Sequence, residues 1–522
     1  MTEGNGDIRE LPKGWTWTRL GNLGKIVAGG TPSTKNEEYW GNEVFWVSPA
    51  DLSGYKRKFI SRGRKSLSKL GLENSSAKLM SAGSILFSSR APIGYVVISA
   101  NEICTNQGFK SLVPSKEIFN EYIYYYLKAS KQLAEKYASG TTFKELSGKS
   151  FSILPIPLPP HKEQKRIVER IEELFSDIDQ GVESLKTAQK QLKVYRQAVL
   201  KWAFEGKLTE AWRKQRDPST IKTGEALLTQ IKAERENRDR QQLAEWEAKV
   251  REWEAIGKVG KKPQKPQKYK DPSPIPKAQI SGSPSIPESW FWTNLEQLKE
   301  FSLYGPRFSS QDYVDDGIPI ARTTDINSSG KVDLKYAPKI SLSDQEFEKY
   351  KLIKGDLLLT RTGSIGTNAV FHASEKAIPG AFLIHYRLLP SLNIWFIFYF
   401  LESPKAQQHF FERSSGVGRP NLNVPSIEEL MIPLPSLEEQ EEIVQEIESR
   451  LSICDQLEAT IIENLQKAEA LRQSILKQAF EGKLVPQDPN DEPAEKLLEQ
   501  IRLERQEKRS PQTPKQLKIK GI

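Results

Sequence analysis

The sequence predicts a mixed α/β (α+β) protein in which two similar globular domains are joined by two long antiparallel helices, which form a coiled coil with pseudo-two-fold symmetry. The first observation behind this prediction is a segment that occurs twice. It begins with Ile-Pro-Leu-Pro at Ile156, ends with Phe-Glu-Gly-Lys-Leu at Leu208, and recurs at residues 432–484. Both landmarks are 276 residues apart (433 − 157 and 480 − 204), so neither copy has an insertion. A helix of fixed length explains this best, because one inserted residue would rotate every later side chain by about 100°.

The second observation is that both halves open alike, with Pro-x-x-Trp-x-Trp at Pro12 and again at Pro287. A repeat of this length indicates two domains of one fold rather than a solenoid. We expect four tryptophans to pack in the core or between domain and helix: Trp15, Trp17, Trp290 and Trp292. The predicted parts are a first domain (1–155), a long helix (156–208), a helical insert with a Lys/Pro-rich linker (209–285), a second domain (286–431), a second long helix (432–484) and a charged helical and flexible tail (485–522).

The third observation is a narrow apolar seam along each long helix, with apolar residues mostly three and four positions apart, as in a coiled coil. The nearest helical partner is the other copy, and two equivalent helices packed across a two-fold axis run antiparallel. Ser436 with Glu439 predicts a capping box, and Gly206 and Gly482 predict C-terminal caps. The predicted helix-pair packing residues are Ile171, Leu174, Ile178, Leu185, Leu192, Val199, Ile447, Leu451, Leu457, Ile461, Leu465 and Ile475.

Inside the domains the repeat is looser. Apolar runs between Gly-rich turns, at residues 83–87 and 355–359, predict short strands. Residues 122–127 correspond to 396–401, and both predict a buried helix. The framework repeats while the polar loop residues differ, which is the behaviour of one scaffold that carries two recognition surfaces.

Composition limits the function classes. Lys and Arg number 76 against 67 Asp and Glu, which permits a polyanionic partner but does not prove one. Two cysteines are too few for a disulfide framework and favour a reducing compartment. No apolar signal segment opens the chain, and its most apolar run, at 394–401, is too short to span a bilayer.

The insert carries a short charged helix, at residues 226–235, that resembles residues 496–505 after the second long helix. Residues 241–255 predict a further helix with Trp246 and Trp253 on one face. The Lys/Pro-rich stretch that follows is read as a solvated flexible linker, with a DNA-binding arm as the alternative.

Enzyme signatures are absent from the sequence. Gly148-Lys149-Ser150 ends like a phosphate-binding loop, but Phe143 stands where the first glycine is required. No Gly-x-Gly-x-x-Gly follows a strand, and no Asn/Asp-Pro-Pro-Tyr/Phe motif of an amino-methyltransferase occurs. The four histidines are not spaced as metal ligands, and His385 reads as a core histidine. The sequence therefore argues for a binding protein, with a nuclease or methyltransferase of unfamiliar motif as a lesser alternative.

The order of these parts resembles the specificity (S) subunit of type I restriction–modification systems. The resemblance rests on Pro-x-x-Trp-x-Trp, a variable domain, Pro-Leu-Pro, Gln164 with Ile167-Val168, a long helix and Ala203-Phe-Glu-Gly-Lys-Leu208, all occurring twice at nearly constant offset. It implies two target-recognition domains that each read one half of a bipartite DNA site. It also implies two docked methyltransferase (M) subunits that modify adenine N6, and restriction (R) subunits that join later. S-adenosylmethionine, ATP and Mg²⁺ would then belong to the partners, this chain would be non-catalytic, and the location would be the cytoplasm of a bacterium or archaeon. The long insert departs from the pattern.

A helix from His161 to Phe204 has 44 residues, or about 66 Å at 1.5 Å per residue. This length bridges recognition sites one duplex turn apart, roughly 34–36 Å, so the helix pair would act as a ruler for the spacer. A structural adaptor that joins two protein-binding domains remains the alternative. The candidate DNA-binding residues are polar loop residues, each of which has a plain surface or turn role as its alternative. They are Thr31, Ser33, Ser89, Arg90, Asn106, Gln107, Thr142 and Lys144 in the first domain, and Arg307, Ser309, Arg322, Thr323, Arg361, Thr362, Arg419 and Asn421 in the second.

Overall fold

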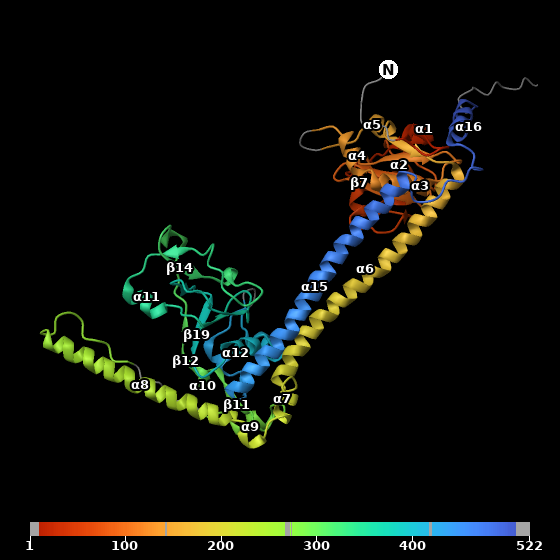
Figure 1. Cartoon of the computed structure of the whole chain (residues 1–522). Helices are drawn as coiled ribbons and strands as arrows, with labels where there is room; N and C mark the ends of the chain where they lie inside the picture. Colours follow the sequence, from red (N-terminus) through yellow and green to blue (C-terminus); the bar gives the residue numbers. More distant parts are fainter. Residues whose placement is uncertain (1–9, 141–143, 267–271, 273, 417–419, 508–522) are drawn as a thin grey trace, which may run out of the picture. The chain divides into compact units, whose positions relative to one another are not determined.

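The computed structural model describes residues 10–140, 144–266, 272, 274–416 and 420–507. It divides into two compact units (Figure 1). Unit 1 comprises Met1–Lys186 and Ile462–Ile522, and unit 2 comprises Thr187–Ile461. The mixed α/β composition and the internal repeat that the sequence predicts are both present.

Unit 1 contains a strand pair and two sheets. Strand β1 (Thr16–Arg19) pairs antiparallel with β10 (Pro155–Leu158), so the Trp-x-Trp opening lies beside the Pro-Leu-Pro entry. The larger sheet has the order β2 (Gly24–Ala28), β9 (Lys110–Pro114), β6 (Ile85–Ser89), β7 (Ile93–Ser99), β4 (Phe59–Ile60), and the smaller one β5 (Ser66–Leu67), β3 (Trp40–Val47), β8 (Cys104–Thr105). The helices are α1 (Leu20–Leu23), α2 (Lys69–Glu73), α3 (Asn120–Ala129), α4 (Lys131–Lys136), α5 (Gly148–Ser152), the first part of α6 (His161–Phe204), the last part of α15 (Leu437–Phe480) and α16 (Ala494–Glu507).

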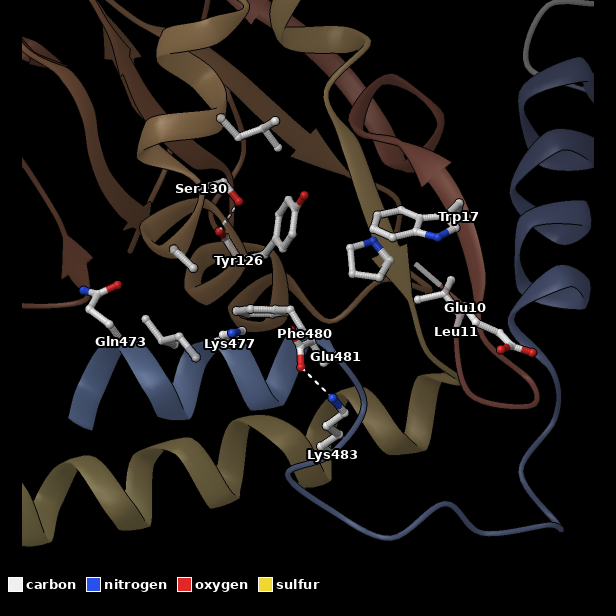
Figure 2. Close-up of a pocket in the computed structure, with 14 residues that line it drawn as sticks. Glu10, Leu11, Trp17, Tyr126, Ser130, Gln473, Lys477, Phe480, Glu481 and Lys483 are labelled. Atoms are coloured by element: carbon white, nitrogen blue, oxygen red, sulfur yellow. Dashed lines mark hydrogen bonds and ion pairs between the residues drawn. The ribbon is translucent and has the colours of Figure 1, made fainter. Parts of the chain in front are cut away.

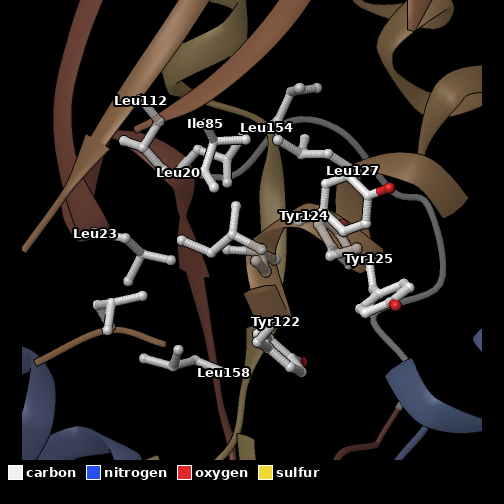
Figure 3. Packing of buried hydrophobic residues seen from close by; sticks show 14 of the residues in the cluster. Leu20, Leu23, Ile85, Leu112, Tyr122, Tyr124, Tyr125, Leu127, Leu154 and Leu158 are labelled. Atoms are coloured by element: carbon white, nitrogen blue, oxygen red, sulfur yellow. The ribbon is translucent and has the colours of Figure 1, made fainter. Parts of the chain in front are cut away.

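The core of unit 1 lies between the larger sheet and α3. All five residues of β6 are buried, as expected of a central strand, and the predicted buried helix at 122–127 is confirmed within α3. Figure 3 shows Tyr122 and Leu158 in this cluster, with Leu20 and Leu112. The Tyr122 hydroxyl donates to the Pro157 carbonyl at 2.7 Å, which anchors the Pro-Leu-Pro entry to the domain.

Unit 2 repeats this arrangement. Strand β11 (Phe291–Asn294) pairs with β20 (Met431–Leu434). One sheet has the order β12 (Lys299–Tyr304), β19 (Leu383–Leu388), β16 (Leu357–Thr360), β17 (Asn368–Val370), and the other β13 (Tyr313–Val314), β15 (Lys339–Ile340), β14 (Ile318–Ala321), β18 (Ile378–Pro379). The helices are α7 (Glu210–Lys214), α8 (Gly224–Ala255), α9 (Lys277–Ser281), α10 (Leu295–Leu298), α11 (Asp344–Tyr350), α12 (Ile394–Leu401), α13 (Pro404–Arg413), α14 (Val424–Glu428), the last part of α6 and the first part of α15.

The repeat extends to individual buried hydrogen bonds. The amide of Gln164 accepts from the Phe119 backbone at 3.1 Å and donates to the Pro159 carbonyl at 3.0 Å. In unit 2, Gln440 accepts from Asn393 at 3.0 Å and donates to Pro435 at 3.1 Å. Both glutamines are fully buried, so each fixes the start of its long helix against the buried helix of its domain.

The two long helices, α6 and α15, have 44 residues each, which confirms the equal lengths that the constant offset predicts. In unit 1, Ile171 shares a buried cluster with Ile475, and Asp179 pairs with Arg472. In unit 2, Val199 shares a buried cluster with Ile447. Within each unit, the contacts move toward the start of α15 as they move toward the end of α6, so the two helix segments run antiparallel there.

The apolar seam is less continuous than predicted. Five predicted packing residues are buried, namely Ile171, Val199, Ile447, Ile461 and Ile475, and six are half-buried, namely Leu174, Ile178, Leu185, Leu192, Leu451 and Leu465. Leu457 is 48% exposed, so its prediction is wrong. The neighbouring Glu458 faces α6 in place of Leu457 and lies 3.2 Å from Arg196 of that helix. Counting heptads in the sequence does not reveal that an ion pair replaces an apolar contact here.

The ends of the long helices explain why two separate motifs repeat together. Gly206 and Gly482 have φ of 73° and 69°, which confirms the predicted glycine caps. A Cβ on Gly482 would lie 2.3 Å from Pro12, and one on Gly206 would lie 2.5 Å from Pro287. The Phe-Glu-Gly-Lys-Leu end thus packs on the Pro-x-x-Trp opening in each unit. The predicted capping box is half formed, since Ser436 accepts from the Glu439 amide at 3.2 Å while the Glu439 carboxylate pairs with Arg213.

One continuous helix spans the two segments of the insert, 226–235 and 241–255, for which separate helices were predicted. Helix α8 runs unbroken from Gly224 to Ala255, because no glycine or proline interrupts it. Its first part packs on unit 2 through Arg235, which donates to the Gln297 carbonyl at 2.8 Å, as Arg505 of α16 donates to Gly21 at 3.0 Å in unit 1. The indole nitrogens of Trp246 and Trp253 donate to the linker carbonyls of Pro263 and Gly260. The rest of the predicted flexible linker, at 267–271 and 273, and the tail at 508–522 lie outside the described residues.

Candidate nucleic-acid interface

Most of the predicted binding residues of unit 1 meet at one edge of the larger sheet. Ala28 at the end of β2 pairs with Lys110 at the start of β9, and Ser89 at the end of β6 donates to the Gly108 carbonyl at 2.7 Å. The loops after β2 and β6 and before β9 therefore leave the sheet together. A Cβ on Gly29 would lie 1.9 Å from the Asn106 carbonyl oxygen, so only glycine allows these loops to approach so closely.

This edge carries an accessible polar set in unit 1. The Thr31 hydroxyl donates to the Gln107 side chain, which joins two predicted residues 76 positions apart. Ser33 is exposed, whereas the Asn106 side chain accepts from the Gly108 amide at 2.9 Å and so shapes the loop. Ser89 is fully buried and donates to Gly108 at 3.0 Å, so the prediction that it contacts a ligand is wrong. Alternation along a strand would have turned it inward beside the buried Phe87.

A hollow of about 770 Å³ lies beside this edge, lined by Arg90, Lys144 and Glu145. Arg90 is 3.5 Å from the Glu145 carboxylate, which also lies 3.4 Å from the largely buried ammonium of Lys110. Glu145 thus pairs with two cations, of which Arg90 lines the hollow. The predicted Thr142 lies outside the described residues.

Unit 2 brings three predicted residues into contact at the equivalent edge. The Asn421 side-chain oxygen accepts from Arg361 Nε at 3.2 Å and from the Thr362 hydroxyl at 2.9 Å. The Arg361 guanidinium lies 4.3 Å from the ring centroid of Tyr304, which ends β12. Stacking on tyrosine and the bond to Asn421 orient this guanidinium, and its Nη atoms have no partner among the residues that the structure describes. Leu422 donates to the Arg361 carbonyl at 2.8 Å, as Leu146 does to Ser89 in unit 1, so the two edges correspond.

The other predicted residues of unit 2 differ in availability. Arg307 is exposed, and Ser309 is exposed while its hydroxyl accepts from the Gln311 amide at 3.3 Å as a helix cap. Arg322 makes a two-pronged contact with Asp325, at 3.0 and 2.8 Å, so its guanidinium is already engaged within the domain. Thr323, next to it, is half-buried at the start of a short 3-10 helix. Arg419 lies outside the described residues.

Sequence reasoning missed a basic segment in unit 1. Residues 56–69 contain seven cations and no acidic residue. Its Gly63 amide donates to the Trp46 carbonyl at 3.2 Å, and the Trp46 indole donates to Gly30 at 3.0 Å, which places the segment beside the loop that carries Thr31. Burial opposes ionisation of Asp51, but hydrogen bonds from Ser48 and Arg64 outweigh it and lower its pKa. The Asp51 carboxylate accepts from Arg64 Nε at 2.9 Å and holds Arg64 beside the short 3-10 helix at 49–52. The charge run itself was the signal that would have found it.

A second concave feature of unit 1 lies where the domain meets α15. It has about 560 Å³ and is lined by Trp17, Tyr126, Phe480 and Lys477 among others (Figure 2). Trp15, Trp290 and Trp292 are buried, as expected of core packing, whereas Trp17 is 40% exposed and lies in this hollow between the domain and α15. In unit 2 the equivalent Trp292 lies beneath Lys405, whose ammonium is 4.3 Å from the ring centroid.

The buried histidine is structural, as predicted. His385 is fully buried, with Nε2 2.8 Å from Asp356, which also contacts Arg387 at 2.7 Å. Burial opposes ionisation of Asp356, but the hydrogen bonds from Arg387 and His385 outweigh it and lower its pKa. Among the described residues, no group of three or more His, Cys, Asp or Glu is arranged to hold a metal ion. In the same part of the chain no helix is long and apolar enough to cross a membrane.

Comparison with known proteins identifies one family. A family model described as the type I restriction modification DNA specificity domain matches residues 12–187 and 287–467. The specificity subunit of the MjaIX type I restriction enzyme of Methanocaldococcus jannaschii is 38% identical over 31% of this chain and 38% of its own length. The EcoBI specificity subunit of Escherichia coli is 28% identical over 77% of this chain and 75% of its own length. The solved HsdS subunit of Thermoanaerobacter tengcongensis shares the fold, with a TM-score of 0.52 and 19% identity over 91% of this chain and 99% of that one.

Proposed function

Because the chain belongs to the family of type I restriction–modification DNA specificity proteins, we propose that it is the DNA-reading, non-catalytic subunit of such a complex. Each domain reads one half of a bipartite site. The observation that carries this is the pair of equivalent sheet edges, which share backbone geometry and differ in side chains. One edge presents Thr31 with Gln107 and the other presents Arg361 with Asn421. Two different half-sites are the expected outcome of one scaffold with two such surfaces.

Among the candidate residues, Arg361 has the side chain that is best oriented to read a base. Arginine contacts guanine O6 and N7 with two parallel N–H groups, which requires a planar guanidinium held in one orientation. Tyr304 and Asn421 provide that orientation. Arg90, Lys144 and the cations of the basic segment at 56–69 other than Lys58, which is paired within the unit, serve phosphates instead, since charge without fixed geometry positions a duplex but does not specify its sequence.

We propose that α6 and α15 form one antiparallel coiled coil that sets the spacer between the half-sites. Each helix is about 66 Å long at 1.5 Å per residue, and each has 44 residues. The contacts within each unit support this pairing, because Asp179 faces Arg472 in one unit and Arg196 faces Asp455 in the other. The complete pairing would relate the two halves by a pseudo-two-fold axis.

We further propose that two adenine-N6 methyltransferase subunits dock on the helix pair, that restriction subunits join through them, and that the complex works in the cytoplasm. S-adenosylmethionine, ATP and Mg²⁺ would be held by those partners. The hollow around Trp17 is the candidate methyltransferase contact in unit 1, because a partly exposed indole in a hollow that Phe480 also lines is the type of residue that anchors protein interfaces. Trp17→Ala should weaken co-purification with a methyltransferase subunit without changing DNA half-site preference, whereas Tyr313→Ala, at an equally exposed aromatic outside the hollow, should change neither.

The proposed function is tested by mapping N6-methyladenine in host DNA with and without this chain. Methylated adenines in a two-part motif should disappear when the chain is deleted and return when it is restored. A methylation pattern that does not depend on the chain would contradict the proposal, and the structural adaptor would then be the better account.

A further inference from the structure

Unit 2 contains an acidic cavity that the DNA-reading role does not use. It has about 690 Å³ and lies between α12, α15 and the loop that carries Gly330. Its lining includes four carboxyl groups, from Glu402, Glu448, Asp455 and Glu458, against the one guanidinium of Arg196. Arg196 is engaged with Asp455 at 2.5 Å and Glu458 at 3.2 Å, so Glu402 and Glu448 are left without a cation of their own among the residues that line the cavity.

The internal repeat shows what occupies the equivalent place in unit 1. There the ammonium of Lys58 pairs with both Glu121 and Glu172 and lies 6.0 Å from the ring centroid of Tyr125. The Tyr125 hydroxyl in turn donates to Glu172 at 3.2 Å. Burial opposes the charge of Lys58, but the two carboxylates outweigh it and raise the pKa of the ammonium. Unit 1 therefore contains a cation-binding site that is occupied by a side chain of the same protein, that of Lys58.

The backbone identifies the residue that replaces Lys58 in unit 2. Ile98 donates to the Lys58 carbonyl at 2.9 Å, and Val370 donates to the Gly330 carbonyl at 2.9 Å, in corresponding parallel pairings. Gly330 therefore stands where Lys58 stands. A Cβ at Gly330 would lie 2.1 Å from the Phe398 ring, so no side chain can supply the cation from that position.

Part of the site is retained in unit 2, because Glu448 and Tyr399 correspond to Glu172 and Tyr125. Trp395 stands where Glu121 stands, and Glu402, at the position of Lys128, supplies the second carboxyl group of the cavity instead. Tyr399 is hydrogen-bonded to Glu448, as Tyr125 is to Glu172, and its ring packs 5.1 Å from that of Phe398. Asn368 adds a separate observation, because it is 2% exposed, lines the cavity, and has a side-chain oxygen without a hydrogen-bond partner. Its amide nitrogen donates to Glu402 at 2.5 Å. A buried acceptor without a partner costs free energy unless a donor reaches it, so the cavity calls for a donor-rich ligand.

We propose that this cavity binds an organic cation, a primary ammonium or guanidinium group on a flexible chain, which takes the place that the Lys58 ammonium takes in unit 1. Glu402 and Glu448 would pair with it, the Asn368 oxygen would accept one N–H, and the faces of Tyr399 and Phe398 would enclose its stem. Such a group is carried either by a free polyamine or by a lysine or arginine side chain of another protein. This inference does not depend on DNA reading.

Isothermal titration calorimetry of the full chain at low salt tests the proposal with spermidine, acetyl-lysine methylamide and acetyl-arginine methylamide. One equivalent of cation should bind to the wild type. Glu402→Gln and Glu448→Gln should each weaken binding about tenfold or more, as expected for a charge-assisted hydrogen bond. Glu441→Gln, which removes an exposed charge of α15 outside the cavity, should leave the affinity unchanged. Binding of spermidine alone would assign the site to polyamines, and binding of the two amino-acid derivatives would assign it to a protein side chain.

The chain offers a matched control in unit 1. Lys58→Ala should free Glu121, Glu172 and Tyr125, and the variant should bind a second equivalent of the same cation. Because burial raises the pKa of Glu402 to about 7, binding to the wild type should also strengthen between pH 6 and pH 8; the other charged groups that face the cavity are Arg196, Glu448, Asp455 and Glu458. Circular dichroism establishes that each variant folds, and Asp455→Asn, at an exposed position, is the reserve variant and should also weaken binding. Absence of a one-to-one titration, or equal affinity of the wild type and the folded Glu402, Glu448 and Asp455 variants, would overturn the proposal.

Discussion

Arg213→Ala removes the buried ion pair that joins α7, which follows the end of α6, to the start of α15 in unit 2. Arg213 pairs with the Glu439 carboxylate, contacts the Thr209 hydroxyl at 2.9 Å and donates to the Gly206 carbonyl at 2.5 Å. The Glu439 side chain is fully buried and that of Arg213 is 16% exposed. Alanine would leave Glu439 with only the Thr209 hydroxyl, at 2.8 Å, as a partner. Loss of one partner from a buried pair costs about 3–5 kcal/mol, mainly because an uncompensated charge stays buried.

Urea unfolding followed by tryptophan fluorescence measures this loss, because the ring of Trp290 lies 5.8 Å from the Arg213 guanidinium and reports on the same junction. With a urea slope of about 3 kcal/mol per molar, the midpoint of the unit 2 transition should fall by about 1–1.7 M. Lys214→Ala is the matched control, since its pair with Glu210 is exposed and the midpoint should fall by only about 0.1–0.3 M. Adding Glu439→Gln to Arg213→Ala should restore part of the loss by removing the buried charge. A midpoint for Arg213→Ala equal to that of Lys214→Ala would refute the reasoning that this pair fastens the two long helices.

Three further perturbations test other parts of the structure. Arg361→Ala should weaken binding to the cognate half-site of unit 2 by about 5- to 150-fold and relax base preference at one position, with little effect on thermal stability because its bond to Asn421 is only partly buried; unchanged preference in a competition assay would remove Arg361 from the readers. Deleting seven residues from both long helices shortens each by about 10 Å, the rise of about three base pairs, so a shorter spacer should be selected with unchanged half-sites, and the ruler fails if the original spacer is retained. Asp356→Asn should destabilise unit 2 at neutral pH: the pKa of Asp356 is lowered from 3.8 in the folded state, so its ionised form contributes stability above pH 3.8 and that contribution is lost as pH falls through the lower folded value. Urea midpoints of wild type and variant should therefore converge in acid, and a constant difference at all pH values would contradict the assigned pairing with Arg387 and His385.

The two long helices and the motifs at their ends could be predicted because the sequence contains each of them in two copies. Constant offset predicted two helices of equal length, and the paired motifs at Gly482 and Pro12 proved to contact each other. Leu457 could not be placed correctly, because a seam of period 3.5 on a helix of period 3.6 drifts, and the exchange of an apolar residue for Glu458 depends on Arg196 of the other helix. The sequence predicted two helices in place of α8 because the residue pattern changes within it. No glycine or proline lies inside the helix, so its backbone continues without a break.

The candidate interface was predictable in location but not in detail. Thr31 follows β2 and Gln107 precedes β9, its antiparallel neighbour, so both residues leave the sheet at one edge. That the two strands are neighbours could not be read from the sequence, because β2 and β9 lie far apart along the chain. The contact of Arg361 with Tyr304 and Asn421 depends on side-chain directions that spacing does not reveal. The prediction that Ser89 contacts DNA was wrong because its polarity suggested exposure, whereas every side chain of the central strand β6 is buried. The acidic cavity is visible only when Gly330 is compared with Lys58 through the backbone pairing of both units.

The central claim is that one chain reads two half-sites at a set distance. Selection of bound molecules from a random duplex library by the purified full chain with its methyltransferase subunits tests it most directly. The account predicts enrichment of two short motifs separated by an unread spacer of one length, with base preference relaxed at one position of the motif read by unit 2 in Arg361→Ala. Enrichment of a single continuous motif, of two motifs at variable spacing, or of no sequence at all would contradict it.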